Sequence, residues 1–461
     1  MTDHAGFEPV HGFDQVTGFE PVATLTVDPD TARILAEGWQ SWSVTESLPV
    51  TAAQYRPTLA NSLAMDCHYN AVPPEGVFQG EGVLAVDPGD GGPVHVFAAE
   101  RTDRTVPRVR AALGPGGTLR ISSDAPVLRL EGEDGGSVQA ALGAWAEDFA
   151  QRAGVSEGRL TRAAPTVWCS WYQYWNTVTE TDMLAELDAM DELDLPFDVV
   201  QIDDGYQAAP GDWLLPSDRF ADLAGLIGRI RAQGRRAGIW TAPLLLGLGS
   251  RLYAEHPDWA VTDPATGEPV FAGDAIGDRC TALDVTNPGA AAYLREVFEA
   301  MRGWGVDYFK IDFMYAGALE GRRYADVTGV EAYREALRII REAIGSDSYL
   351  VGCGAPLLPA AGFVDAMRVG PDIAAHWSAP SGHPSEPSQR NATRNVRARA
   401  WQHGRLWTND PDCLMLRPGV ERREEWARTV ETHRGLMSSG DGLRALDDWG
   451  LATTRRLLWP S

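Results

Sequence analysis

Short apolar segments alternate with amphipathic ones from Pro165 to the end of the chain, and this alternation constrains the fold more than any other feature of the sequence. Strands are predicted near eight positions: Trp168, Val199, Gly238, Tyr308, Tyr349, Ala366, Leu406 and Leu436. Helices are predicted between most of them, over residues 181–193, 223–233, 290–302, 331–344, 388–402 and 421–433. Eight strand–helix units in about 290 residues predict a (β/α)8 barrel, with a doubly wound open sheet as the alternative.

The part of the chain before the barrel follows a different pattern. Short runs of alternating apolar and polar residues, such as 77–86 and 108–113, are separated by clusters of Gly, Pro and Asp. This pattern is typical of antiparallel strands joined by tight turns. We therefore predict an N-terminal β-sandwich-like domain over residues 1–135, a linker helix within 136–160, and the barrel over 161–461.

One connection of the predicted barrel is unusually long. Residues 244–289 separate the third strand from the fourth, and we interpret them as an elaborated loop beside the functional site. This segment contains a predicted strand of its own, ALDVT, at residues 282–286.

The charge balance and the cysteines bear on partners and location. The chain has 40 Lys and Arg residues against 64 Asp and Glu residues, a formal net charge of −24, and such a surface repels the phosphates of nucleic acids. No apolar run reaches the length of about 18 residues that a membrane span requires. Five scattered cysteines and an N-terminus without the features of a secretion signal predict a cytoplasmic protein with reduced thiols.

Residues capable of chemistry gather at the predicted strand ends, where the functional site of such a barrel lies. They include the only lysine of the chain, Lys310. Cleavage of a glycosidic bond needs one carboxylate as nucleophile or base and one carboxylic acid, and indole faces suit the apolar face of a sugar. The candidate residues are Trp168, Trp171, Asp203, Asp204, Trp240, Lys310, Asp312, Cys353, Gly354, Arg368 and Asp372.

Other chemistries lack their sequence signals. The nine histidines are dispersed and form no HxH or HExxH pattern of a zinc site. No GxSxG, P-loop or GxGxxG motif follows a predicted strand. We therefore expect a small-molecule substrate, with no metal and no cofactor.

Taken singly, the same residues also fit structural roles. Asp203 and Asp204 fit the cap of the next helix, and Lys310 fits half of a structural ion pair. Trp168 and Trp171 fit positions in a hydrophobic core. Their joint placement at strand ends is what favours a site.

Eight ordered motifs resemble glycoside hydrolase family 36, the clan of α-galactosidases and raffinose synthases, and most closely its compact bacterial branch. The resemblance runs from Gly38 to about Trp449. It begins with GWQSWS, and its densest motifs are WCSWYQYW, QIDDGYQ with the following GDWL, GIWTAP, HPDW, YFKIDF, GCGAPLLP, MRVGPD and NDPDCLMLR.

The resemblance implies roles for single residues. Asp312 matches the nucleophile of the family's KxD motif, and Asp372 matches the general acid/base. Lys310 and Arg368 match ligands of the ring hydroxyls. Two nearby cations should keep Asp312 ionised, whereas Asp372 needs a less cationic or more desolvated setting.

Other matches concern the walls of the pocket. Asp203 and Asp204 match the carboxylate pair on the O4 and O6 side of galactose, and Trp240 matches a pocket-wall indole. The GWQSWS loop resembles one that reaches over the pocket, where Trp39 or Trp42 would supply a ring. Further substrate contacts are expected from Trp168, Trp171, Cys353 and Gly354.

The resemblance thus implies a retaining exo-α-galactosidase that acts on small oligosaccharides such as melibiose or raffinose, through a covalent β-linked glycosyl-enzyme. A transglycosylase of the same family and a catalytically silent sugar-binding protein are the alternatives. Family members usually continue into a C-terminal β-sandwich. Because this chain ends at Ser461, soon after the barrel, we expect that domain to be absent.

Overall fold

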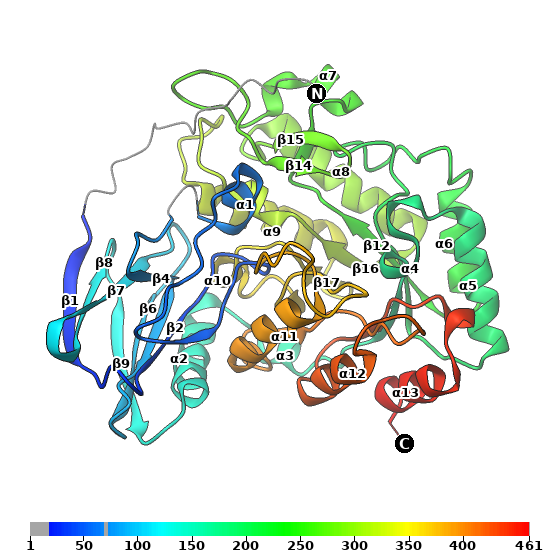
Figure 1. Ribbon diagram of the computed structural model, residues 1–461. Helices are drawn as coiled ribbons and strands as arrows, with labels where there is room; N and C mark the ends of the chain where they lie inside the picture. The colour runs from blue at the N-terminus through cyan, green and yellow to red at the C-terminus, as the bar shows by residue number, and fades with distance from the viewer. Residues whose placement is uncertain (1–17, 69–71, 461) are drawn as a thin grey trace, which may run out of the picture.

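The computed structural model describes residues 18–68 and 72–460. Two antiparallel sheets from the N-terminal part of the chain lie beside a parallel barrel (Figure 1). Residues 1–17, where no secretion signal is expected, lie outside the described part, and the limits of the predicted domains stay a prediction. No described helix is long and apolar enough to cross a membrane, and the five cysteines are buried free thiols.

The barrel prediction is confirmed by the order of the strands. The first seven of eight parallel strands follow one another in chain order in the sheet, and the eighth pairs with the first, at Thr166 with Met437, so that the sheet is a nearly closed barrel. An open doubly wound sheet would instead reverse its order at a switch point, so that alternative is excluded. The strands are β10 (Thr166–Cys169), β11 (Val199–Ile202), β12 (Arg236–Thr241), β16 (Val306–Ile311), β17 (Tyr349–Gly352), β18 (Ala366–Arg368), β19 (Thr408–Asp410) and β20 (Met437–Ser439).

The predicted helices lie between these strands, and local capping explains where several of them begin. Thr179 and Asp182 form a capping box at the start of α5, and Thr328 and Glu331 form another at the start of α9. The helix predicted over 388–402 ends earlier, and a 3₁₀ turn over Ala400–Gln402 follows it. The helices are α5 (Glu180–Glu192), α6 (Leu223–Ala232), α8 (Pro288–Trp304), α9 (Gly329–Ile344), α11 (Gln389–Ala398), α12 (Arg423–Thr432) and α13 (Asp448–Leu458).

The N-terminal strands form a sandwich, because residues from both sheets share one core that includes Phe78, Leu84 and Ile121. One sheet has the order β1-β8-β7-β4 and the other the order β3-β2-β5-β6-β9. Their bounds are β1 (Glu20–Thr26), β2 (Arg33–Ala36), β3 (Ser47–Pro49), β4 (Val77–Glu81), β5 (Val83–Asp87), β6 (Pro93–Ala98), β7 (Arg108–Gly114), β8 (Thr118–Ser123) and β9 (Leu128–Asp134).

The run predicted as one strand over 77–86 is two strands, β4 and β5, which belong to different sheets. Gly82 separates them with a φ of +80°, and a Cβ there would lie 2.4 Å from Leu358 of the barrel. Only glycine combines this backbone geometry with so close an approach. The chain therefore passes from one sheet to the other at this residue.

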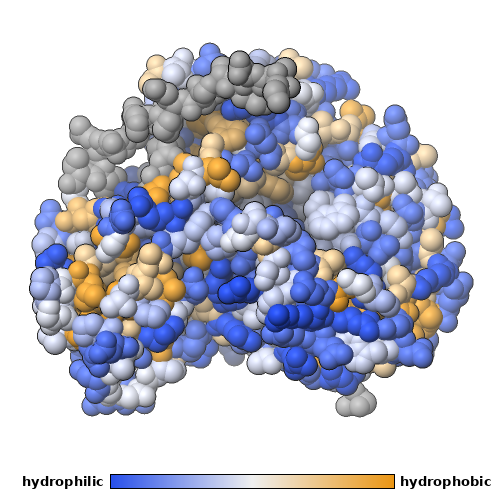
Figure 2. All heavy atoms as spheres, in the orientation of Figure 1, coloured by the Kyte–Doolittle hydropathy of each residue, from blue (hydrophilic) through white to orange (hydrophobic). Residues whose placement is uncertain are grey.

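Helix α2 (Val138–Ala153) joins the sandwich to the barrel. Its Trp145 is fully buried, donates its indole N–H to the carbonyl of Ala99 at 3.2 Å, and packs against Trp401 with ring centroids 5.7 Å apart. The outer face in Figure 2 is mostly hydrophilic, with apolar residues scattered over it, as expected of a strongly charged chain.

The long connection after β12 contains a small sheet, with strands β13 (Leu245–Gly247), β14 (Gly273–Ala275) and β15 (Asp278–Ala282) in the order β13-β15-β14. The strand predicted over 282–286 is therefore wrong, because β15 ends at Ala282. Asp284 accepts hydrogen bonds from Thr286 and from the backbone of Tyr324, which turns the chain out of the sheet. Helix α1 (Ala60–Asp66) packs against β14, although it belongs to the N-terminal part of the chain.

Candidate active site

A cavity of about 890 Å³ lies at the carboxyl ends of the barrel strands. Its volume is within the range of about 300–1,000 Å³ that is usual for small-molecule sites. Seven of the predicted site residues line it at those ends, as the topology of a barrel requires. They are Trp171, Asp203, Asp204, Trp240, Lys310, Asp312 and Asp372.

Asp312 follows β16 directly and is held at both carboxylate oxygens. Its Oδ2 accepts the indole N–H of Trp240 at 3.0 Å, and its Oδ1 accepts the backbone N–H of Phe313 at 2.8 Å. Lys310 Nζ lies 3.8 Å from Oδ2. These contacts restrict the rotation of the carboxylate, and they use side chains from two adjacent strands.

Lys310 is buried between two carboxylates. Its Nζ lies 3.2 Å from Asp203 Oδ2 and 3.8 Å from Asp312 Oδ2, and only 6% of the residue is exposed. Burial by itself lowers the pKa of this ammonium, but Asp203 and Asp312 outweigh that effect and raise the pKa well above its ordinary value. The lysine is therefore charged and holds two functional carboxylates in one cluster.

Asp203 and Asp204 form the deepest acidic part of the cavity. Asp203 Oδ2 also accepts the thiol of Cys169 at 3.3 Å, and its backbone N–H donates to Ser170. Burial raises the pKa of Asp204 to about 6, against a hydrogen bond from Gln207 that favours the charged form. Both carboxylates are thus fixed by neighbouring side chains, and the next helix, α6, is capped by Asp222 instead.

Asp372 lines the same cavity but follows a different strand, β18. Its Oδ2 accepts the indole N–H of Trp171 at 3.1 Å, and its Oδ1 accepts from Arg368 Nη1 at 2.9 Å. Its side chain is 26% exposed, whereas that of Asp312 is 9% exposed. The two carboxylates therefore line one cavity with different access to solvent.

Arg368 does not approach the cavity itself but lies behind Asp372. Its other nitrogens contact Asp410 at 3.3 Å and Asp412 at 2.8 Å. Burial, together with Asp372 and Asp410 nearby, raises the pKa of Asp412 to about 7 although Arg368 opposes the shift. One guanidinium thus contacts three carboxylates.

The electrostatics differ from the sequence-based expectation in two ways. Only Lys310, not Arg368, lies beside Asp312, and burial raises the pKa of Asp312 even though Lys310 lowers it. Asp372, which was expected in a less cationic setting, contacts the guanidinium directly. The reason is that the side chain of Arg368, at the end of β18, contacts Asp410 and Asp412. These carboxylates are buried and need a positive charge nearby.

Three more predicted residues do not line the cavity. Trp168 is fully buried and donates its indole N–H to the carbonyl of Asp441 at 2.9 Å, so its expected substrate contact is wrong and the core alternative is correct. Cys353 is also fully buried, and its thiol hydrogen-bonds Asp312 from behind. Gly354 has a φ of +50°, and a Cβ there would lie 2.8 Å from the ring of Trp42.

The structure decides which tryptophan of the GWQSWS loop reaches the cavity. Trp42 lines it and packs edge-on against Phe313 with centroids 5.0 Å apart. Trp39 instead stacks on His68, 4.0 Å between centroids, and is buried in the core. Gly354 makes room for the Trp42 ring, which gives that glycine a role next to the site.

A buried arginine of the barrel holds this loop in place. Arg399, which is 0% exposed, contacts Glu37 Oε1 at 2.8 Å and Thr45 Oγ1 at 2.9 Å. It also donates to the backbone carbonyls of Gln40 and Ser43, each at 3.1 Å. Because both ends of the loop are tied to one side chain, the loop that carries Trp42 is fixed to the barrel.

Several lining residues escaped the analysis of the sequence. They come from α1, from the turn between β14 and β15, and from residues 381–387. The strand-end rule does not find them, since none follows a barrel strand directly. The Pro, Ser and Gly content of 380–387 predicts only a loop, and α1 carries no signal that places it near the barrel.

Comparison with known proteins agrees with this architecture. Residues 162–334 match the family model described as the glycosyl hydrolases family 31 TIM-barrel domain. The α-galactosidase of Thermus thermophilus, solved with p-nitrophenyl α-D-galactopyranoside, is 29% identical, with a TM-score of 0.80 over 95% of this chain and 88% of that chain. A structure of the same enzyme with stachyose has a TM-score of 0.78.

More distant relatives extend the comparison. The α-galactosidase of Escherichia coli is 30% identical over 153 residues, which are 31% of this chain and 21% of that protein. The matched segment thus spans about a fifth of that relative's length. The family 36 α-galactosidase of Geobacillus stearothermophilus shares the fold at 13% identity, with a TM-score of 0.62 over 94% of this chain and 61% of that chain. The chain is therefore an α-galactosidase homologue that shares its fold with enzymes of glycoside hydrolase family 36.

Proposed function

We propose that the protein is a retaining exo-α-galactosidase that removes terminal α-linked galactose from small oligosaccharides such as melibiose and raffinose. One observation carries the proposal: Asp312 and Asp372 line the same cavity, each oriented by an indole N–H, and only Asp372 has substantial access to solvent. Two carboxylates with separate surroundings are what double displacement at a sugar carbon requires. The likeness to an enzyme solved with galactosides supports the choice of sugar.

In the first step, a carboxylate oxygen of Asp312 attacks the anomeric carbon while the bond to the leaving oxygen breaks. Asp372 gives its proton to that oxygen, so the aglycone leaves as a neutral alcohol. In the second step, Asp372 accepts a proton from water, and the water oxygen displaces Asp312 from the anomeric carbon. Two inversions return the α configuration, and both carboxyl groups regain their starting states.

The buried cluster around Lys310 accounts for recognition of a terminal sugar. Asp203, Asp204 and Lys310 are at most 6% exposed, so the ring that reaches them is enclosed. Carboxylates accept and the ammonium donates hydrogen bonds to ring hydroxyls, each worth about 1.5–3 kcal/mol with a charged partner. A chain-internal sugar, which is substituted at both ends, would not fit there.

A panel of nitrophenyl α-glycosides tests the proposal. We expect the α-galactoside to be cleaved fastest, with α-galactose as the first product in a proton NMR time course. Preferential cleavage of another glycoside, or a β first product, would contradict it. Turnover measured with and without an added acceptor sugar separates hydrolysis from transfer, and binding without any cleavage would indicate the silent sugar-binding alternative.

Replacing the general acid should affect substrates according to their leaving groups. Asp372→Ala is expected to lower the kcat/KM for melibiose by about 10²–10⁴-fold, because its leaving sugar requires a proton. Aryl galactosides with a good leaving group should lose much less in the glycosylation step. Steady-state kinetics on both substrates checks this, and equal losses would remove the acid role from Asp372.

A substitution of the single lysine, Lys310, tests its role between two carboxylates. Lys310→Arg keeps the charge but places a broad planar group between Asp203 and Asp312, where a compact ammonium fits. We expect kcat/KM for p-nitrophenyl α-galactoside to fall by about 10²-fold. Arg251→Lys, at a side chain 69% exposed, is the matched control and should leave activity unchanged. A fully active Lys310→Arg enzyme would rule out this role.

A further inference from the structure

The outer wall of the active-site cavity, which α1 and segment 381–387 form, contains a carboxylate that the proposed mechanism does not use. Asp66, the last residue of α1, lines the cavity together with Ser385 of segment 381–387. The other outer carboxylate, Glu386, already accepts a hydrogen bond from Ser381. Asp66 has the neighbouring hydroxyl of Ser385 as a partner, so the two form a polar pair in this wall.

The surroundings of Asp66 fix its position without neutralising it. Gln40 Nε2 donates to Asp66 Oδ1 at 3.4 Å, and Ser43 Oγ donates to the backbone carbonyl of Asp66 at 2.7 Å. Both residues belong to the loop that carries Trp42. Desolvation raises the pKa of Asp66 to about 6, and a hydrogen bond with the hydroxyl of Ser385 opposes this shift.

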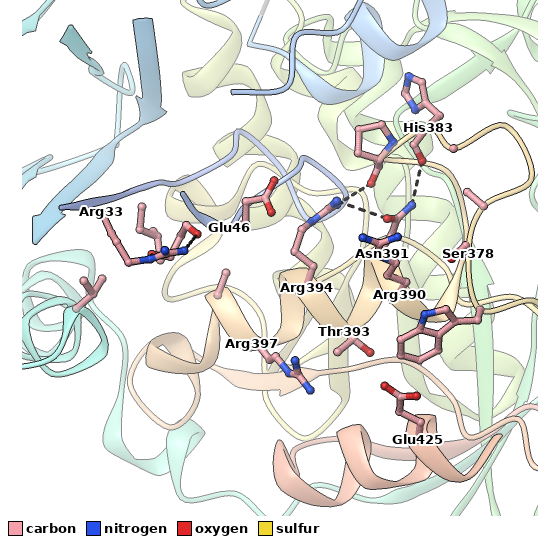
Figure 3. Close-up of a pocket in the computed structure, with 18 of the residues that line it drawn as sticks. Arg33, Glu46, Ser378, His383, Arg390, Asn391, Thr393, Arg394, Arg397 and Glu425 are labelled. Carbon is pink, nitrogen blue, oxygen red and sulfur yellow. Dashed lines mark hydrogen bonds between the residues drawn. The ribbon is translucent and has the colours of Figure 1, made fainter. Parts of the chain in front are cut away.

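Segment 381–387 is held from its far side, where a second cavity of about 910 Å³ lies. Figure 3 shows Asn391 and Arg394 of α11 directed at this segment. Asn391 Nδ2 donates to the carbonyls of His383 at 3.0 Å and Glu386 at 2.9 Å, and Arg394 donates to that of Pro384 at 2.6 Å. The segment is thus anchored at three carbonyls that flank Ser385.

A contact from the N-terminal part of the chain completes the arrangement. Tyr55 Oη lies 2.7 Å from His383 Nε2, and Ser385 Oγ lies 3.1 Å from His383 Nδ1. Asp66 and Ser385 are therefore both held in place, and these neighbouring residues come from the N-terminal part of the chain and from the barrel, respectively. Neither lies among the groups that hold the terminal galactose.

We propose that Asp66 and Ser385 bind hydroxyl groups of the leaving sugar, so that they determine the preference for oligosaccharides over aryl galactosides. This inference rests on the proposed function. A carboxylate accepts two hydrogen bonds from neighbouring hydroxyls of a sugar, and such charge-assisted bonds are the stronger ones. A nitrophenyl leaving group has no hydroxyl to offer, so its cleavage does not draw on this pair.

The test compares two substrates in each variant. For Asp66→Asn, we expect the kcat/KM for raffinose to fall by about 10- to 100-fold, while that for p-nitrophenyl α-galactoside stays within about 3-fold. For Ser385→Ala, a smaller loss of about 5-fold confined to raffinose is expected. Asp274→Asn, at an exposed carboxylate of β14, the strand that packs against α1 outside the cavity lining, is the matched control and should change neither value.

The outcomes separate the inference from the proposed function. If the wild-type enzyme cleaves no galactoside, the proposed function fails, and the inference fails with it. If it cleaves both substrates but Asp66→Asn lowers them equally, the residue is structural and the inference alone is overturned, as it is if neither value changes. Should Asp66→Asn not fold, as judged by its thermal unfolding, the selective loss in Ser385→Ala decides the matter.

Discussion

Asp312→Gly is expected to lower the kcat/KM for p-nitrophenyl α-galactoside by at least ~10⁴-fold, because it removes the carboxylate that we propose as the nucleophile. The glycine leaves a space bounded by the indole N–H of Trp240 and the backbone N–H of Phe313, both of which now bind the carboxylate. Azide should enter this space, attack the anomeric carbon and restore turnover. Because only one displacement then occurs, the product should be the β-galactosyl azide.

The control for this variant lies on the same strand. Asp307 is at the opposite end of β16, where its side chain is 36% exposed and pairs with Arg236 at 3.0 Å. Asp307→Asn should retain full activity. Undiminished hydrolysis by Asp312→Gly, or an azide product of α configuration, would show that the nucleophile is another residue.

The second large effect concerns stability rather than chemistry. Arg399→Met is expected to lower the free energy of unfolding by about 3–5 kcal/mol, because it leaves Glu37 as a fully buried charge without its cation. It also removes the donors to the carbonyls of Gln40 and Ser43, so Trp42 loses its support. Urea titrations followed by tryptophan fluorescence would measure the change, and galactosidase activity should fall in the same variant.

Two further variants show whether the unpaired charge is the cause. In Arg399→Met/Glu37→Leu no buried charge remains, so a substantial part of the lost stability should return. Arg405→Met removes a nearby pair with Glu147, whose side chain is 64% exposed, and should cost less than about 1 kcal/mol. Equal effects of Arg399→Met and Arg405→Met would contradict the buried ion pair as a major contributor.

Much of the barrel could be predicted because its signals are local. The apolar segments and helix faces after Pro165 repeat with the periods of strands and helices, and a parallel barrel brings all the carboxyl ends of its strands to one side. Asp203, Asp204, Lys310 and Asp312 therefore meet in one cavity although up to 109 positions separate them in the sequence. Their position relative to strand ends is sufficient for that conclusion.

Residues outside regular elements were harder to place, because their direction depends on distant partners. Trp39 and Trp42 occupy the same motif, but Gly354 leaves space for one ring while His68 stacks on the other. Arg368 could have faced either of the two carboxylates that we propose as catalytic, Asp312 or Asp372. Arg368 lies on the side of Asp372 because Asp410 and Asp412 are buried there, and their burial is a property of the packed barrel.

The difference between what the sequence predicts and what only the tertiary structure determines has a simple physical basis. Period and capping act over a few residues, so the eight-stranded barrel and the meeting of its strand-end groups follow from the chain alone. The outer wall of the cavity depends on hydrogen bonds between residues far apart in sequence, such as those between Asn395 and the carbonyl of Ser43 and between Tyr55 and His383. These bonds form only once sandwich and barrel have packed together, and they are what brings Trp42 and Asp66 to the site.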